Sequence, residues 1–517
     1  MNILSRLAAV STAVLIFAAP ALAQDTRPSL TIGVQALPDG LDPGLNISNV
    51  GQRINYSVFD ELIRRAFWEG EKGDGSALAP SIATEWRNVT PNEWEVDIRT
   101  DVVFHDGTAM TAEDVAFSFS EERVFGEERL VAVGPTYFGN FTSVEVLDED
   151  TVRFTTKAPD PIFPQRFTTT MGKVVPKEYY LELGPDEFNL APIGTGPYRV
   201  AEIRPGELIR LESNDDYWGG LPPAKEITFV EIPEMATRLS GLMTGELDII
   251  TDVSPDQKDV LAQTPGVNLM PSLVDNSRVI VFNTFAPPMD DANMRRAMFY
   301  GADRQAVVDA LWAGDSQVLP ELVFASHGEA YADRKAAAYD PEETKRLLNL
   351  AGYAGEELIL RIPDGYYSNF LEVSQVLQEM WRENGINVTI EQRDTGANLT
   401  EGNWHMRAWS NGMQMADITH PLANVWGNTS VRTSKDNRNY TWEQPVRLQE
   451  LIDLLNTTVD ADQRVAYAKE ALDIIETEAP QMEMFQNVEY FGVRDGVDWK
   501  PYAFFMMDLG PQNLSFE

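Results

Sequence analysis

Two hydrophobic periods alternate along this chain, the two-residue period of a β-strand and the longer period of an α-helix. Trp94, Val96 and Ile98 alternate with charged residues, which predicts a half-buried strand. Thr111 then precedes Ala-Glu-Asp114 in the way that an N-cap precedes a helix. Further predicted strands cover residues 31–34, 151–155, 226–232, 278–282, 357–362 and 387–391. This alternation predicts a mixed α/β (α+β) fold.

Helix boundaries can be read further along the chain as well. Asp340 and Pro341 open a helix as its N-cap and first residue, and Gly352 closes it. Residues 464–478 form another predicted helix, with Val465, Ala468, Leu472 and Ile475 at helical spacing. The chain has 517 residues, and a single hydrophobic core stops growing at roughly 250–300 residues. More than one compact unit is therefore expected.

Cysteine content and charge exclude several classes of protein. The chain has no cysteine, so disulfides, thiolate metal sites and a lipidated N-terminal cysteine are excluded. Its formal net charge is -39. Binding to a nucleic acid backbone depends on clustered Lys and Arg, so this acidic balance argues against a nucleic acid partner. It argues equally against electrostatic docking on anionic lipid.

The first residues predict export. A start with Arg6, an apolar stretch from Leu7 to Ala19 and a small-x-small end at Ala21 and Ala23 describe a signal peptide over residues 1–23, cleaved after Ala23. The apolar stretch is too short for a membrane span, which needs about 20 residues. No later segment approaches that length, so we expect a periplasmic protein without stable membrane insertion and without a lipid anchor.

Motifs of enzymes are scarce. The four histidines, His105, His327, His405 and His420, match no metal-ligand spacing. There is no Gly-x-Ser-x-Gly elbow and no phosphate-binding Walker loop. We therefore expect no enzymatic activity, no metal site and no cofactor. A secreted glycoside hydrolase stays open as an alternative, because 80 acidic residues offer many carboxylate pairs.

A series of short motifs follows in a fixed order. Phe104-His-Asp-Gly107 precedes Thr111-Ala-Glu-Asp-Val115, and Gly194-Thr-Gly-Pro-Tyr198 precedes Asn214-Asp-Asp-Tyr-Trp-Gly219. Leu78-Ala-Pro80 stands before them, and after them come residues 238–248, 294–298, 339–343 and 347–353. In this order the chain resembles the periplasmic solute-binding proteins of the dipeptide/oligopeptide family, family 5, which serve ABC importers.

The resemblance implies a two-lobed periplasmic binding protein fold, type II-like, with an extra subdomain in lobe I. Lobe I would comprise residues 24–283 plus 479–517, and lobe II residues 284–478. The lobes would close over a solute and deliver it to the permease and ATPase subunits of the importer. The protein is expected to act as a monomer.

The resemblance also suggests a binding site. In peptide-binding members, an Asp in an aromatic-plus-Asp-Pro segment holds the peptide's amino group, and Asp417 is the best match here. His420 stands where an Asp usually precedes the proline, Pro421. Trp404 and Trp409 belong to an aromatic-rich stretch that could stack on sugars or bury peptide side chains. The predicted ligand-binding residues are Asp417, Trp409, Trp404, Asn283, Tyr366 and Asn46. A di- or oligopeptide is the first choice of solute, and an oligosaccharide or an opine-like compound is the alternative. A periplasmic chaperone or sensor built on the same fold is a third hypothesis.

Overall fold

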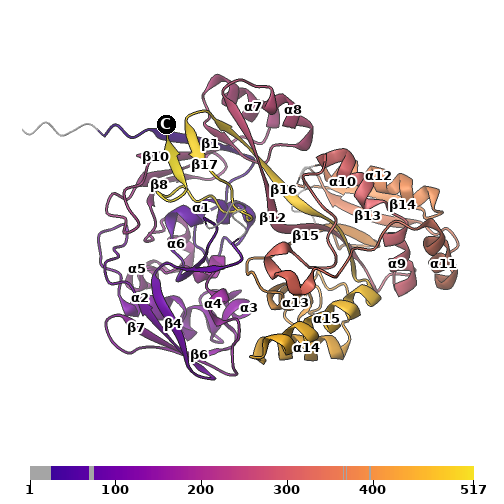
Figure 1. Ribbon diagram of the computed structural model, residues 1–517, viewed down its shortest axis with the longest axis horizontal. Helices are drawn as coiled ribbons and strands as arrows, with labels where there is room; N and C mark the ends of the chain where they lie inside the picture. The colour runs from indigo at the N-terminus through magenta and orange to yellow at the C-terminus, as the bar shows by residue number, and fades with distance from the viewer. Residues whose placement is uncertain (1–24, 69–74, 365, 368, 395–397) are drawn as a thin grey trace, which may run out of the picture.

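The computed structural model describes residues 25–68, 75–364, 366–367, 369–394 and 398–517. Residues 1–23, predicted to be a signal peptide, lie outside the described residues. Figure 1 shows two bodies of mixed helices and strands, joined by two long strands through the middle of the molecule. In the described part of the chain, no helix is both long and apolar enough to cross a membrane.

A ten-stranded mixed sheet runs through both bodies, in the order β14-β13-β15-β12-β16-β11-β1-β10-β9-β8. Its strands are β1 (Ser29–Val34), β8 (Tyr198–Arg204), β9 (Leu208–Ser213), β10 (Glu226–Glu231), β11 (Ile249–Ile250), β12 (Val267–Phe282), β13 (Leu358–Pro363), β14 (Val388–Arg393), β15 (Met406–Gly412) and β16 (Gln481–Arg494). We call the body that holds β1 to α8, with β17 and β18, the N-terminal body. The central body holds α9 to α15 with β13 to β15.

The two longest strands, β12 and β16, are antiparallel and belong to both bodies. Residues 267–273 of β12 pair with the last part of β16, while residues 276–282 pair with β15 in the central body. The register of the β12–β16 ladder shifts between Leu273 and Ser277. This irregularity lies where the paired strands pass from one body into the other.

The N-terminal body contains a second, four-stranded antiparallel sheet in the order β4-β5-β7-β6. A cluster of aromatic rings fills its core, and the Trp94 ring stacks on Phe163 with centroids 4.6 Å apart. The remaining elements of this body are α1 (Asn49–Val58), β2 (Ile63–Arg65), β3 (Leu78–Pro80), β4 (Ala83–Thr90), β5 (Glu93–Ile98), α2 (Ala112–Ser118), α3 (Gly134–Phe138), β6 (Phe141–Val146), β7 (Thr151–Thr156), α4 (Phe163–Arg166), α5 (Lys177–Leu183), α6 (Pro185–Leu190), α7 (Met235–Thr244), α8 (Lys258–Ala262), β17 (Val497–Trp499) and β18 (Leu514–Phe516).

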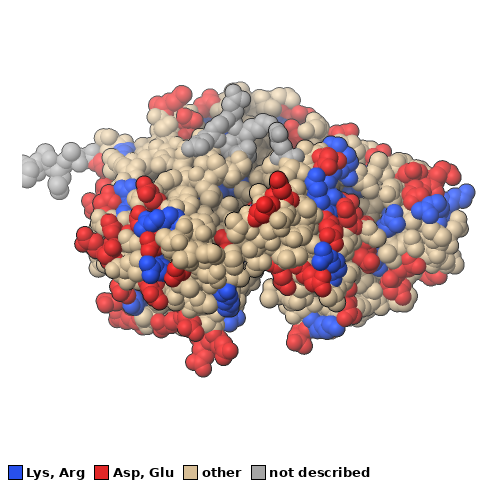
Figure 2. Space-filling view, turned by 60° about the horizontal axis from the view of Figure 1, so that its bottom comes forward, with Lys and Arg blue, Asp and Glu red and all other residues tan. Residues whose placement is uncertain are grey.

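The central body packs helices against its part of the large sheet and adds a group of three helices, α13 to α15, beside it (Figure 1). Its helices are α9 (Ala292–Tyr300), α10 (Arg304–Trp312), α11 (Pro341–Ala351), α12 (Phe370–Glu383), α13 (Thr419–Trp426), α14 (Val446–Thr457) and α15 (Ala461–Glu478). On the face shown in Figure 2, acidic side chains are spread over both bodies, with Lys and Arg scattered among them.

The local predictions hold well. The mixed α/β class is confirmed. Each predicted strand overlaps a strand of the structure, and none extends beyond that strand by more than one or two residues. Thr111 caps α2 in a reciprocal capping box with Asp114. Asp340 caps α11 by accepting from the Glu342 and Glu343 amides, and Gly352 ends that helix in a left-handed conformation.

Candidate functional site

A cavity of about 240 Å³ lies between the two bodies. Its N-terminal wall comes from Ile47, just before α1, and from α3 and the residue preceding it. Its central wall comes from β15, from α13 and from the loop that follows α13. The lining residues are Ile47, Val133, Thr136, Tyr137, Trp409, Ser410, Asn411, Gly412, Asn424, Val425, Thr429, Ser430, Val431 and Arg432. A cavity lined by both bodies is a site that a movement of one body against the other would open.

The Trp409 ring on the central wall contacts two arginines, Arg432, which also lines the cavity, and Arg407, which lies beside the lining. Arg407 and Trp409 are two residues apart on β15 and therefore share a face of the sheet. The Arg407 guanidinium carbon lies 4.3 Å from the centroid of the Trp409 ring, and that of Arg432 lies 5.4 Å from it. Both contacts are close enough for cation–π attraction, which is stronger in a desolvated setting.

Both arginines are buried, each with about 2% of its surface exposed. Among the described residues, no carboxylate forms an ion pair with either guanidinium. The Arg407 Nε and Nη2 atoms have no hydrogen-bond partner, whereas Arg432 donates to the side chains of Gln481 and Asn411. Burial lowers the pKa of Arg407 to about 10, and burial together with the charge of Arg407 lowers the pKa of Arg432 to about 9. Both groups therefore remain charged at neutral pH.

A third buried arginine, Arg278 of β12, lies on the neighbouring strand. Its guanidinium carbon is 4.6 Å from the centroid of the Tyr367 ring, and its Nη1 donates to Asn276 Oδ1 at 3.1 Å. The adjacent Tyr366 is 56% exposed and contacts the Tyr367 ring edge-on at 4.8 Å. Of the two tyrosines, Tyr367 is therefore the one that faces the cationic cluster formed by Arg278, Arg407 and Arg432.

The Asp417 carboxylate is engaged within the central body. Its two oxygens accept from Arg464 Nη2 at 2.8 and 2.9 Å, and Oδ1 also accepts from the Thr419 amide at 2.8 Å. Arg464 also donates to the Thr419 hydroxyl. These bonds fix the start of α13 and place Asp417 outside the set of side chains that line the cavity.

The other predicted residues lie outside the lining of the cavity. Trp404 is buried, and its ring centroid is 5.8 Å from the Arg407 guanidinium carbon. Asn283 donates to the Trp404 carbonyl at 3.1 Å and so fixes the chain just before β15. Asn46 donates to Asn189 Oδ1 and precedes Ile47 in the N-terminal wall. Only Trp409 of the six predicted residues lines the cavity itself.

Arg407 and Arg432 are not among the residues predicted from the sequence. The position of Arg407 could have been predicted from the sequence, because Arg407 and Trp409 have the two-residue spacing that places two side chains on the same face of a strand. Arg432 lies 23 residues after Trp409, and only the packing of the loop after α13 against β15 brings the two together.

The bodies touch each other beside the cavity through residues that follow β15. Gln414 Oε1 accepts from the Thr170 amide of the N-terminal body at 3.0 Å. Met415 is buried in the aromatic core of that body. The His420 ring stacks on Tyr137, with centroids 6.2 Å apart and an angle of 22° between the planes. We call Gln414, Met415 and His420 the bridging segment, because they hold the cavity closed on one side.

The histidines form no catalytic arrangement in the part of the chain that the structure describes. His105 exchanges hydrogen bonds with the backbone of Gly194 and Gly196, and burial lowers its pKa to about 4. His405 accepts from the Ile359 amide, and His327 accepts from the Phe324 amide. No group of three or more His, Asp or Glu residues is arranged to hold a metal ion within the described ranges.

Comparison with known families matches residues 77–433 to "Bacterial extracellular solute-binding proteins, family 5 Middle". Di/tripeptide-binding protein 1 of Pseudomonas aeruginosa is 25% identical over 508 residues, which cover 92% of each chain. The fold is also that of the Helicobacter pylori periplasmic binding protein DppA in complex with the peptide STSA, with a TM-score of 0.80, 21% identity and coverage of 95% and 99% of the two chains. The binding protein AgaA of A. tumefaciens R10, in complex with agropinic acid, superposes with a TM-score of 0.80 at 23% identity, covering 95% of this chain and 99% of AgaA.

Proposed function

Because the chain belongs to the bacterial extracellular solute-binding proteins of family 5, we propose that it captures its solute in the cavity beside Trp409 and delivers it to an ABC importer. In this proposal the two bodies act as the two lobes expected from the sequence, residues 24–283 with 479–517 and residues 284–478. Binding shifts a population of open molecules to a closed form that the permease recognises. In this role the protein is a periplasmic carrier without enzymatic activity, and its signal peptide is removed after Ala23.

One observation carries the choice of solute chemistry, namely the pair of buried arginines that contact the Trp409 ring. A buried cation without an ionic partner is costly, and a ligand anion that reaches it recovers much of that cost. Guanidinium groups bind carboxylates through two parallel hydrogen bonds, and Arg407 has two donors free for this purpose. We therefore expect the solute to carry a carboxylate that binds Arg432 at the cavity wall and reaches the donors of Arg407 beside it, with the body of the solute against the Trp409 ring.

A di- or oligopeptide with a free C-terminus fits this chemistry and is the first choice. The Pseudomonas relative is named a di/tripeptide-binding protein, and the Helicobacter protein was solved with a peptide. The peptide backbone would lie between Trp409 and the N-terminal wall formed by Ile47 and Tyr137. Asn46, Trp404, Asn283 and Tyr366 would shape the surroundings rather than provide the charged contact.

An opine-like or other polycarboxylate solute is the second candidate. The observation in its favour is that Arg464 already neutralises Asp417, the carboxylate expected to hold a peptide's amino group. Acidic solutes that lack a free ammonium need no such carboxylate. AgaA, which shares the fold, was solved with agropinic acid.

Calorimetry with a matched panel of solutes tests the proposal. The panel contains di- and tripeptides, the same peptides as C-terminal amides, N-acetylated peptides, opine acids and neutral oligosaccharides. We expect solutes with a free carboxylate to bind and their C-terminal amides to bind about 10- to 100-fold more weakly, which is the usual range for a charged hydrogen bond. N-acetylation separates the candidates, because it weakens binding only if a free amino group is recognised.

Substitutions then test whether Arg407 and Arg432 bind the carboxylate of the solute. Arg407→Gln and Arg432→Gln should each weaken the tightest solute by about 10- to 100-fold. Arg382→Gln, an exposed guanidinium on α12, is the matched control and should leave the affinity unchanged. Tight binding of a neutral oligosaccharide that is indifferent to Arg407→Gln would overturn the proposal.

A further inference from the structure

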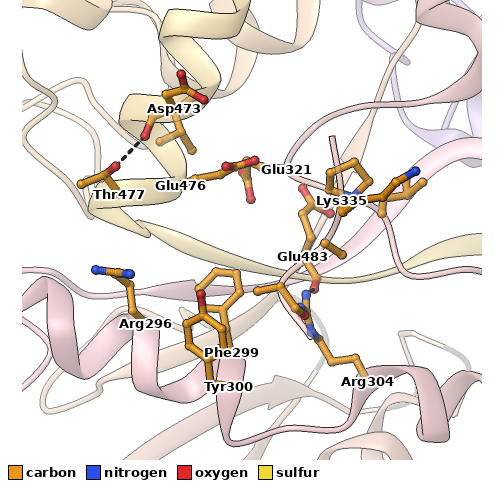
Figure 3. A pocket seen from close by; sticks show the side chains of 15 residues that line it. Arg296, Phe299, Tyr300, Arg304, Glu321, Lys335, Asp473, Glu476, Thr477 and Glu483 are labelled. Carbon is orange, nitrogen blue, oxygen red and sulfur yellow. Dashed lines mark hydrogen bonds between the residues drawn. The ribbon is translucent and has the colours of Figure 1, made fainter. Parts of the chain in front are cut away.

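A second pocket, within the central body, lies apart from the cavity between the bodies and shares no lining residue with it. It has a volume of about 410 Å³ and lies between the ends of α9 and α15, with β16 as part of its floor (Figure 3). Phe299 and Tyr300 of α9 and Ile475 of α15 provide a partly aromatic wall. Glu321 and Glu483 lie between these helices in Figure 3.

The two carboxylates are buried together. Glu321 is 6% exposed and Glu483 is 2% exposed. The Gln481 side-chain amide donates to both, at 2.6 Å to Glu321 Oε1 and at 3.0 Å to Glu483 Oε1. The Glu483 Oε2 atom is buried without a hydrogen-bond partner. A carboxylate in this setting lacks much of the solvation that it has in water, and the amide of Gln481 replaces only part of it.

The neighbouring cations do not contact this pair of carboxylates directly, although Arg432 stabilises the charge of both glutamates from a distance and Arg304 that of Glu483. Arg304 donates to the carbonyl oxygens of Glu483 and Ala337 rather than to a carboxylate. Lys335, at the rim, donates to the Ala332 carbonyl at 3.1 Å. The other two acidic residues of the pocket, Asp473 and Glu476, already form ion pairs with Arg334. Within the described residues, neither Glu321 nor Glu483 forms an ion pair with a Lys or Arg.

We propose that this pocket is a second binding site, which takes a small organic cation whose ammonium or guanidinium group reaches Glu321 and Glu483. The cationic group would supply donors to Glu483 Oε2 and to Glu321, and an apolar or aromatic body would lie against Phe299 and Ile475. A compact metal ion is a poorer fit, because the described residues contain no group of three acidic or histidine ligands arranged around one point.

The second site is linked to the cavity between the bodies by one side chain. Gln481 donates to both glutamates, and its Oε1 atom accepts from Arg432 and from Asn411 at 3.2 Å. A cation bound at the glutamates would therefore lie three hydrogen bonds away from Arg432 of the cavity, through a glutamate and Gln481. The proposal itself does not depend on which solute the cavity binds.

Calorimetric titration with methylammonium, benzylammonium and agmatine at pH 8 tests the site. At least one of these cations should bind saturably, with a dissociation constant below about 10 mM, and benzoate should not compete. Glu321→Gln and Glu483→Gln should each weaken binding at least about tenfold, which is the effect of losing one charged partner. Glu342→Gln, at the exposed start of α11, is the charge-matched control and should leave binding unchanged. Trp409→Ala should leave it unchanged as well, which separates this site from the cavity between the bodies.

The pH dependence gives an independent readout. Burial raises the pKa of Glu483 to about 7, and burial together with the charge of Glu483 raises the pKa of Glu321 well above its ordinary value, so the cation competes with protons for the same oxygen atoms. Affinity should therefore fall about tenfold from pH 8 to pH 6, because the ionised fraction of a group with this pKa falls by that factor. The absence of binding by every cation, binding of benzoate instead, or cation binding that neither glutamine variant weakens would each overturn the proposal. Thermal melts of both glutamine variants establish that they are folded.

Discussion

Asp417 shows how a residue can fit a family pattern while its charge serves a local purpose. Its carboxylate binds Arg464 and the Thr419 amide, and both charged side chains are about 15% exposed. We expect Asp417→Asn to lower the free energy of unfolding by about 1–2 kcal/mol, since the pair is partly shielded from water. Solute affinity should change by less than about threefold. Urea unfolding and calorimetry measure the two effects.

Arg464→Gln is the matched control for this prediction, because it removes the same ion pair from the other side. The two variants should behave alike. A large loss of peptide affinity in Asp417→Asn, but not in Arg464→Gln, would assign Asp417 to the solute's amino group.

Because of Glu483, the free energy of unfolding should decrease as the pH rises through 7. Its pKa is raised by burial to about 7 in the folded protein, against an ordinary value of 4.5. The folded state therefore holds a proton that the unfolded state releases between these values, and the stabilisation present below pH 4.5 is lost as the pH rises through 7. Glu483→Gln should raise the free energy of unfolding at pH 8 by on the order of 2–3 kcal/mol and leave it nearly unchanged at pH 4. Denaturant unfolding at the two pH values measures the difference, and an equal shift at both would contradict the assignment.

The start of α2 shows how strongly a local sequence signal can determine the end of a helix. Thr111 accepts from the Asp114 amide and Asp114 accepts from the Thr111 amide, so that each satisfies a free donor at the start of α2. Thr111→Ala removes one of these contacts and should lower the free energy of unfolding by about 1 kcal/mol. Thr111→Ser keeps the hydroxyl and should unfold like the unchanged protein in the same urea titration.

Caps and alternating strands could be predicted because their signals lie within a few residues of each other. The pattern of β16 is different. Every residue from Gln481 to Val493 is buried, including Glu483, Gln486 and Glu489, so the strand shows neither alternation nor a continuous apolar run. Several of its polar side chains bond to partners far away in the sequence, such as Glu321 and Val274 for the amides of Gln481 and Gln486. The strand is therefore recognisable only after the fold has assembled around it.

The residues of the candidate site also fall into two groups, those that could be predicted from the sequence and those that could not. Trp409 could be predicted from the family pattern and the local aromatic content. The partner arginines could not, because one of them comes from a loop whose position depends on tertiary packing. The engagement of Asp417 by Arg464 was equally hidden, because 47 residues separate the two.

At the scale of the molecule, the bridging segment makes closure sensitive to acid. The buried His420 ring stacks on Tyr137 of the other body, and both ring nitrogens lack partners. Burial lowers its pKa to about 4, and Arg166 and Arg65 oppose protonation further, although Asp417 favours it. An exposed histidine takes up a proton near pH 6.5, so the closed contact weakens as the pH falls from 6.5 towards 4, by about 2 kcal/mol at pH 5.

We therefore expect the solute-free protein to expand between pH 7 and pH 5, as measured by the radius of gyration in small-angle X-ray scattering. His420→Phe keeps an aromatic ring without a titratable group and should abolish the change. His105→Gln, whose histidine lies within the N-terminal body, should leave the expansion intact. An equal expansion in His420→Phe would remove His420 as its cause.

The path of β16 has a further consequence, for the order in which the molecule can assemble. The strand lies between β11 and β12 in the large sheet, yet its residues come after more than nine-tenths of the chain has been made. Until residues 481–494 emerge, β1 and β11 of the N-terminal body have no neighbour joining them to β12. Pairings between such distant segments form slowly. The sheet therefore closes last at its centre, and a nascent chain that lacks its final residues exposes an unpaired edge that a chaperone could hold.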